Sequence, residues 1–222
     1  MSPWERLLEK PPACGHLVQL YHSGGAECSL VNNVGLYISE GLKRREGALV
    51  IATQAHWEAF TQELHRLDCV PQPAIGERRL VFLDAEQTLE RFLVAGQPNW
   101  ERFEIAIGAG LRLLQPQEHL VGIRAYGEMV GLLWNARQFS AAIRLEQFWN
   151  KLLARVSFSL YCAYSIDPHD QESHAAMLDR VLSTHSHVIP SYSSTFEREL
   201  FSPDVAFSPH LPLHSSSPGM SR

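Results

Sequence analysis

The chain has 222 residues, of which 45% are hydrophobic and 19% charged, and its formal net charge at pH 7 is −5. These proportions describe an ordinary globular protein that is long enough to bury a full core. The acidic balance and the lack of any Lys/Arg run argue against a nucleic-acid partner, so a small ligand or a basic partner is the easier match.

The four cysteines, Cys14, Cys28, Cys69 and Cys162, show no CxxC motif and no regular spacing. The amino terminus, MSPWERLLEKPP, lacks the positive region and the apolar run of a secretory signal. No apolar stretch reaches the roughly 18 residues that a membrane span needs. We therefore expect a cytoplasmic protein with reduced thiols and no membrane partner.

Short continuous apolar runs, typical of buried strands, alternate along the chain with longer segments in which apolar residues have the spacing of an amphipathic helix. In chain order we expect a strand at 16–21, a helix at 29–45, a strand at 48–53, a helix at 55–67, a strand at 79–85, helices at 86–94 and 100–114, a strand at 119–125, helices at 127–136 and 140–154, and a strand at 157–164. This order predicts a three-layer α/β fold with a mostly parallel sheet that is covered on both faces.

The domain is expected to span residues 14–190, after an N-terminal extension at 1–13. Pro71 and Pro73 are placed in a loop. After Pro190 the chain becomes rich in Ser, Pro and His and has few periodic apolar residues. Residues 191–222 are therefore predicted to be a mostly disordered tail.

Polar side chains follow the expected strands at their carboxyl ends, where open α/β sheets bind ligands. If the sheet is parallel, these residues converge on one edge and outline a single pocket. The residues at the strand ends are Tyr21, His22, Thr53, Asp84, Glu86, Arg124 and Tyr126, and Glu128 opens the next helix.

Two roles are open for Arg124. Its planar guanidinium can hold a carboxylate or a phosphate of a ligand, or it can form a buried structural bridge with Glu128 or Glu146. Glu128, near a helix start, can accept hydrogen bonds from backbone amides. Glu146 and Asn150 lie four residues apart on one helical face. We interpret these four residues as one polar cluster that either lines the pocket or braces it.

No complete catalytic or metal-binding pattern is visible. Cys28 near a helix start and His22 are conceivable as a nucleophilic pair, but no third group to orient the histidine is evident. Asp84 and Glu86 resemble Mg²⁺ ligands, yet there is little for the ion to bridge. The histidines near the carboxyl terminus match no closed zinc spacing; they are His169, His174, His185 and His187. We expect no catalytic residue, metal or cofactor.

A family resemblance extends over nearly the whole predicted domain. Its first motifs are HLVQLY, the Gly-Leu pair at 41–42, LVIAT and FLDAEQTL. The stronger ones are RAYGEMVGLLW, AAIRLEQFWNKL, FSLYCAYSID and the later HSHVIP. With these motifs in this order, the chain resembles the MEDS sensory domain. That family is named for methanogen and methylotroph proteins and includes the sensory domain of a dichloromethane-responsive regulator.

The resemblance implies similarity to RecA-like ATPase domains, in which a phosphate-binding loop G-x-x-x-x-G-K-[ST] follows the first strand. From Gly24 onward, the places of the second Gly and the Lys hold Ser29 and Leu30. Glu27 adds a negative charge that repels a triphosphate, and it is included among the pocket candidates. The expected fold is therefore RecA-like without a functional phosphate loop, and ATP hydrolysis is not expected.

The family resemblance implies a non-enzymatic sensory role, with small hydrocarbon derivatives as the ligand class. We expect the output to pass through a separate protein, either a histidine kinase or a response regulator. Two alternatives stay open. One is an enzyme, either a nucleotide hydrolase or a Cys-dependent acyl transferase, and the other is a structural interaction module whose pocket is filled by side chains.

Overall fold

The computed structural model describes residues 2–22, 27–114, 120–166 and 171–190. Within these ranges, the side chains of His22, Glu27 and residues 171–175 are not described. The tail predicted to be disordered, residues 191–222, lies outside the described residues, as do Gly24 and Gly25 of the loop after the first strand and His169.

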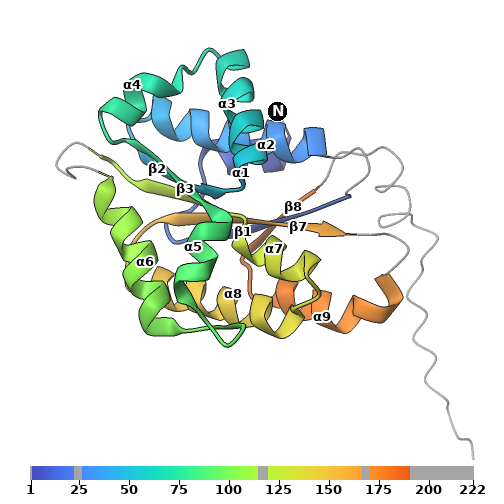
Figure 1. The fold of residues 1–222 in the computed structure, drawn as a ribbon. Coiled ribbons are helices and arrows are strands. Elements are labelled where there is room, and N and C mark those ends of the chain that lie inside the picture. Colours follow the sequence, from blue (N-terminus) through green and yellow to red (C-terminus); the bar gives the residue numbers. More distant parts are fainter. Residues whose placement is uncertain (1, 23–26, 115–119, 167–170, 191–222) are drawn as a thin grey trace, which may run out of the picture. The chain divides into compact units, whose positions relative to one another are not determined.

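The described residues form helices on both sides of one central sheet (Figure 1). The helices are α1 (Pro3–Glu9), α2 (Glu27–Lys43), α3 (Gln54–Arg66), α4 (Pro71–Gly76), α5 (Ala85–Phe92), α6 (Trp100–Leu113), α7 (Met129–Asn135), α8 (Phe139–Leu153) and α9 (Gln171–Ser183). The strands are β1 (His16–His22), β2 (Gly47–Ala52), β3 (Leu80–Asp84), β6 (Ile123–Gly127), β7 (Ser159–Ile166) and β8 (His187–Ile189), with a short pair β4 (Leu93–Val94) and β5 (Gln97–Pro98).

The central sheet has the strand order β3-β2-β6-β7-β1-β8, and every neighbouring pair in it is parallel. Helices α1 to α4 cover one face and α5 to α9 cover the other (Figure 1). This is the three-layer parallel α/β fold that the sequence predicts. The RecA-like classification stays a prediction.

Strand alternation divides the apolar interior into two cores. In β1, Val18 contributes to the core under α5–α9, and Leu17 and Tyr21 contribute to the core under α1–α4. In β7, Cys162 and Tyr161 alternate in the same way. All six residues of β2 are buried, which explains why the apolar runs in the sequence are continuous.

Several elements differ from the sequence-based prediction. The strand expected at 119–125 is β6, which begins at Ile123 and ends at Gly127. The loop expected around Pro71 contains the short helix α4, with Pro71 in its first turn. The segment HVI forms β8, a strand that was not predicted.

The segment predicted as an N-terminal extension contains α1. Ser2 and Glu5 form a reciprocal capping box at its start, and Pro3 occupies its first turn. Leu8 is fully buried in the core under α1–α4. The helix belongs to the same compact unit as the sheet.

Arg124 connects α1 to the rest of the fold. The side chain is 1% exposed, and its Nη1 donates to the carbonyl oxygens of Leu8 at 2.7 Å and Tyr37 at 2.8 Å. Its Nη2 donates to the Glu9 carbonyl at 2.8 Å, and its Nε pairs with Glu46. One guanidinium therefore satisfies the carbonyls at the end of α1 and joins β6, α1, α2 and the loop before β2.

The expected position and the expected partners of Arg124 are both wrong. Arg124 is the second residue of β6, at the end of the strand opposite the carboxyl edge, because β6 starts four residues later than predicted. Its acidic partner is Glu46 and not Glu128 or Glu146. Of the two open roles, the buried structural bridge describes its contacts.

Among the described residues, no helix combines the length and the apolar character that a membrane span requires.

Replacing Arg124 by Met should lower the free energy of unfolding by about 3 kcal/mol or more, because the buried carbonyls and Glu46 lose their donors. Urea denaturation of the full chain measures this loss. Arg44→Met is the matched control, since Arg44 is 41% exposed and its ion pair with Glu40 is 3.7 Å long. That control should cost less than about 1 kcal/mol. Equal losses in the two variants would contradict a structural role for Arg124.

Candidate functional site

The carboxyl edge of the sheet contains a point where the chain changes face. β2 and β6 are neighbours. The chain leaves β2 into α3, on the face of α1–α4, and leaves β6 into α7, on the opposite face (Figure 1). In open α/β sheets, ligands usually bind outside the strand ends at such a divergence.

Glu128 lies at the divergence, between the carboxyl ends of β2 and β6. Its Oε2 accepts the backbone N–H of Thr53 at 2.8 Å, and its Oε1 lies 2.7 Å from Nδ1 of His56. The Thr53 hydroxyl lies 3.3 Å from both carboxylate oxygens and also caps α3. Glu128 is 6% exposed. The carboxylate therefore fixes the start of α3 to the start of α7.

Tyr126 lies beside this contact. Its ring is buried against Phe60 and Tyr161, with both ring pairs edge-to-face. Within the described part of the chain its hydroxyl has no hydrogen-bond partner. Burial, together with the nearby Glu128 and Tyr21, raises the pKa of Tyr126 well above its ordinary value. The phenol is therefore a neutral donor without an acceptor.

The predicted pocket residues do not all meet. Thr53, Tyr126 and Glu128 come together, and His56, which was not predicted, joins them. Asp84 ends β3 and caps α5 by accepting the N–H of Gln87 at 2.8 Å. Four strand spacings separate β3 from β1, or about 19 Å.

Asp84 and Tyr21, at the ends of those two strands, are therefore too far apart to line one small pocket. Glu86 is exposed in the first turn of α5, next to Asp84. The remaining pocket candidates, His22 and Glu27, have side chains outside the described residues.

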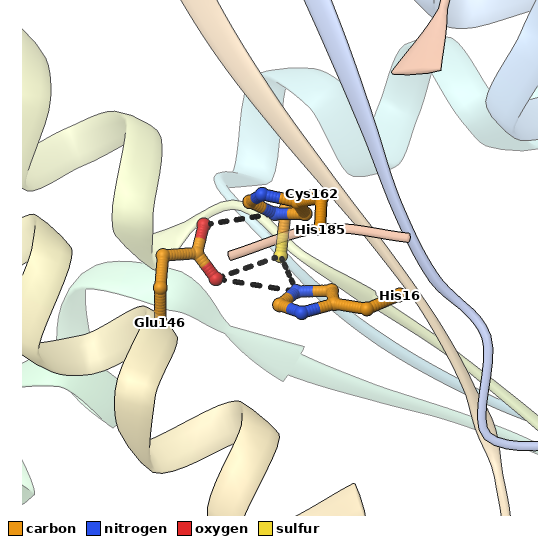
Figure 2. Close-up of side chains that lie close together, drawn as sticks. All are labelled: His16, Glu146, Cys162 and His185. Atoms are coloured by element: carbon orange, nitrogen blue, oxygen red, sulfur yellow. Dashed lines mark hydrogen bonds and ion pairs between the residues drawn. The ribbon is translucent and has the colours of Figure 1, made fainter. Parts of the chain in front are cut away.

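A second polar site lies on the opposite face of the sheet, under α8. His16 begins β1, Cys162 is in the middle of β7, Glu146 projects from α8, and His185 follows α9. Figure 2 shows the four side chains pointing toward one another. The side chains of Glu146 and His185 are fully buried, His16 is 3% exposed and Cys162 is fully buried. We call these four residues the buried tetrad.

The polar atoms of the tetrad are closely spaced. Glu146 Oε2 lies 3.2 Å from His16 Nε2 and 3.7 Å from Cys162 Sγ. Cys162 Sγ is 3.5 Å from His16 Nε2, and His185 Nε2 is 3.3 Å from Glu146 Oε1. The last contact lacks hydrogen-bond geometry, so His185 Nε2 has no hydrogen-bond partner among the described residues.

Neighbouring groups fix the orientation of both imidazoles. The amide nitrogen of Asn150 donates to the Thr184 carbonyl at 2.9 Å, which leaves its oxygen to accept from His16 Nδ1, also at 2.9 Å. His185 Nδ1 donates to the Val181 carbonyl at 2.7 Å. In both neutral rings the lone pair is therefore on Nε2 and faces the interior of the tetrad.

The predicted cluster of Arg124, Glu128, Glu146 and Asn150 is wrong as one unit. Arg124 lies at one end of β6, Glu128 lies past its other end, and Glu146 lies on α8. The smaller prediction, a structural pair of Glu146 and Asn150 on one helical face, agrees with their common contact with His16.

Burial and charge act against each other on the ionisable groups here. Burial opposes ionisation of Glu146, but His185 and His16 hold the pKa of this carboxyl well below its usual value. Burial favours the neutral form of His185, but the Glu146 carboxylate raises the pKa of this imidazole. Burial and Glu146 together raise the pKa of the Cys162 thiol well above its usual value.

Cys162, His16 and Asn150 are arranged in the order of a Cys-His-Asn nucleophile, with thiol, imidazole and amide in contact. A reactive cysteine needs a lowered pKa and access to its substrate. Cys162 is fully buried and its pKa is raised. The geometry alone therefore does not make it a nucleophile.

The sequence contained a partial signal for the tetrad. His16 is a polar first residue in an otherwise apolar strand, and Cys162 is a polarisable residue in another. Their proximity depends on the parallel pairing of β1 with β7, in which Val18 is opposite Cys162. That pairing was not part of the prediction, so the four residues could not be grouped.

The parallel sheet with helices on both faces defines a three-layer α/β domain. The chain belongs to the MEDS family, described as the methanogen/methylotroph, DcmR sensory domain, which matches residues 15–186. This confirms the family predicted from the sequence, and a MEDS domain is a sensory domain. No curated protein sequence matches the chain.

In the native protein, iodoacetamide should alkylate Cys162 more than about 100-fold more slowly than Cys14 or Cys28, because only the latter two are exposed. Peptide mass spectrometry at successive times measures the three rates, and labelling in urea is the control for intrinsic reactivity. If Cys162 reacts as fast as Cys14 in the folded chain, the tetrad is accessible and the nucleophile interpretation gains support.

Proposed function

We propose that this chain is a non-enzymatic sensory domain that binds a small molecule at the carboxyl edge between β2 and β6. Membership of the MEDS family supports the sensory role. Small hydrocarbon derivatives are the ligand class that we propose on the basis of the family resemblance. The bound state passes to a separate signalling protein, either a histidine kinase or a response regulator.

One observation carries the position of the binding site: the buried Tyr126 hydroxyl, for which the described residues provide no acceptor. The aromatic rings of Phe60 and Tyr161 surround this phenol. A small ligand with an apolar body and one acceptor atom complements such a surface, because it buries apolar area and takes the unused O–H.

Through the contact of Glu128 with Thr53 and His56, ligand binding can change the structure of the rest of the domain. The Glu128 carboxylate holds α3 on one face to α7 on the other. A ligand beside Tyr126 that competes for Glu128 or Thr53 would change this link. The relative positions of two helices on opposite faces would then depend on occupancy.

The start of α2 supports a role other than nucleotide hydrolysis. Leu30, at the place of the phosphate-loop lysine, is fully buried in the core under α1–α4. The Ser29 hydroxyl accepts a hydrogen bond from Gln19 at 2.8 Å. Neither side chain is positioned to neutralise a phosphate, which in this class of enzymes is the task of the lysine.

The test is a thermal-shift screen of the full chain against halocarbons, small alcohols, small organic acids and nucleotides. A halocarbon or small alcohol at about 100 times its Kd should raise Tm by about 5 °C or more. Tyr126→Phe should reduce this shift while leaving the unliganded Tm unchanged or higher, because it removes a buried hydroxyl that has no partner.

Tyr37→Phe is the matched control, since its buried hydroxyl bonds to Ser159 at 2.9 Å and 3.0 Å. It should lower the unliganded Tm and keep the ligand shift. ATP turnover that is lost in Glu128→Gln would instead establish the enzyme alternative. If no compound shifts Tm and a kinase is captured by the bare domain, the interaction module replaces the sensor.

A further inference from the structure

The spacing of the buried tetrad matches that of a tetrahedral metal site. Zinc bonds of about 2.0–2.1 Å to nitrogen or oxygen and about 2.3 Å to sulfur place neighbouring ligand atoms about 3.3–3.7 Å apart. Among His16 Nε2, Cys162 Sγ and Glu146 Oε2 the separations are 3.2 Å, 3.5 Å and 3.7 Å. His185 Nε2 lies 3.3 Å from the other carboxylate oxygen, Oε1. All four ligand atoms lie within 4.8 Å of one another, so the widest pair needs to close by at most about 1.5 Å.

We propose that His16, Glu146, Cys162 and His185 bind one divalent transition-metal ion of the zinc type, held in the core between α8 and the sheet. Two imidazoles, a thiolate and a carboxylate form a closed four-ligand set, which is typical of a structural or metal-sensing site and not of a catalytic one.

The orientation of the imidazoles supports a cation at the centre of the tetrad. The contacts with Asn150 and with the Val181 carbonyl place the N–H of each neutral ring on the outside. Both Nε2 lone pairs then face the Glu146 carboxylate, at 3.2 Å and 3.3 Å. Each lone pair repels the carboxylate unless a cation lies between them. A proton on Nε2 can serve as that cation, and so can one metal ion coordinated by both imidazoles and the carboxylate.

The charges of the ligands also fit a divalent ion. A thiolate at Cys162 and a carboxylate at Glu146 contribute two negative charges, and neutral histidines contribute none. A divalent cation makes the whole site neutral. Neutrality matters because the side chains of all four ligands are at most 3% exposed, and an unbalanced charge is costly where water is excluded.

The surrounding hydrogen bonds have the form of an outer ligand shell. Asn150 orients His16, the Val181 carbonyl orients His185, and the Tyr164 hydroxyl donates to Glu146 Oε1. In metal sites, such partners set the tautomer of a histidine and the direction of a carboxylate. Every oxygen- or nitrogen-bearing ligand of the tetrad has one.

This site lies on the face of the sheet opposite Tyr126, the residue on which the proposed ligand position depends. The proposal therefore goes beyond the ligand site of the proposed sensor. Either one can fail while the other stands, because the metal measurements use no small-molecule ligand.

Two measurements on the full chain test the proposal. Protein purified without chelator should contain about one zinc per chain by mass spectrometry of the metals. Chain refolded from guanidinium with one equivalent of Co²⁺ should show a thiolate-to-cobalt band in the near ultraviolet and the intense visible bands of tetrahedral cobalt. Refolding with Zn²⁺ instead of EDTA should raise Tm by about 5 °C or more.

Control variants distinguish the loss of a metal ligand from a general loss of folding. The triple variant Cys14→Ser, Cys28→Ser, Cys69→Ser keeps Cys162 as the only thiol and should retain the near-ultraviolet band. His185→Gln should lose metal binding, whereas His187→Gln, two residues away and outside the tetrad, should keep it.

The proposal is overturned if the folded wild-type chain binds less than about 0.1 metal per chain after refolding with Zn²⁺ or Co²⁺, with circular dichroism confirming the fold. It is equally overturned if the near-ultraviolet band disappears in the triple cysteine variant, because the ligating thiol is then not Cys162. Should His185→Gln fail to fold, the wild-type metal content and the triple variant still decide the outcome.

Discussion

The carboxylate of Glu146 sits in an interior that excludes water, and the surrounding fold is arranged to satisfy it. An unpaired buried carboxylate would destabilise the domain by several kcal/mol. Here β1, β7 and the segment after α9 each contribute a polar side chain to it, through His16, Cys162 and His185. Segments that are distant in sequence therefore meet at one residue of α8. The packing of the face formed by α5–α9 depends on how this charge is balanced.

The two faces of the sheet contain different polar sites. The sites are separate because successive side chains of a strand point to opposite faces. Arg124 and Tyr126 lie on the face of α1–α4, where one ties α1 into the fold and the other presents an unused hydroxyl. Val18 and Cys162 lie on the opposite face. A one-residue shift in β6 or β7 would exchange these environments. The close packing of both cores holds the register, so the proposed sensing and metal sites stay chemically independent.

The hydrophobic pattern of the sequence was sufficient to predict the parallel fold. Continuous apolar strands that alternate with amphipathic helices are compatible with few other fold classes. The same pattern did not predict where the fourth strand begins and ends. A difference of a few residues there placed Arg124 at the carboxyl edge, when it lies at the other end of β6. The tetrad was out of reach for another reason. It requires β1 to lie between β7 and β8, and β8 has only three residues, too few for a periodic signal.

The main chain at the two limits of the family domain is joined by hydrogen bonds. His16 donates its N–H to the Ser186 hydroxyl at 2.9 Å, and its carbonyl accepts the Ser186 N–H at 2.8 Å. The family match runs from residue 15 to residue 186, so the point where the chain enters this domain touches the point where it leaves. A module with adjoining ends can be placed inside a loop of another protein without stretching its host. The same domain is therefore suited to insertion in the middle of another protein as well as to a position at one of its termini.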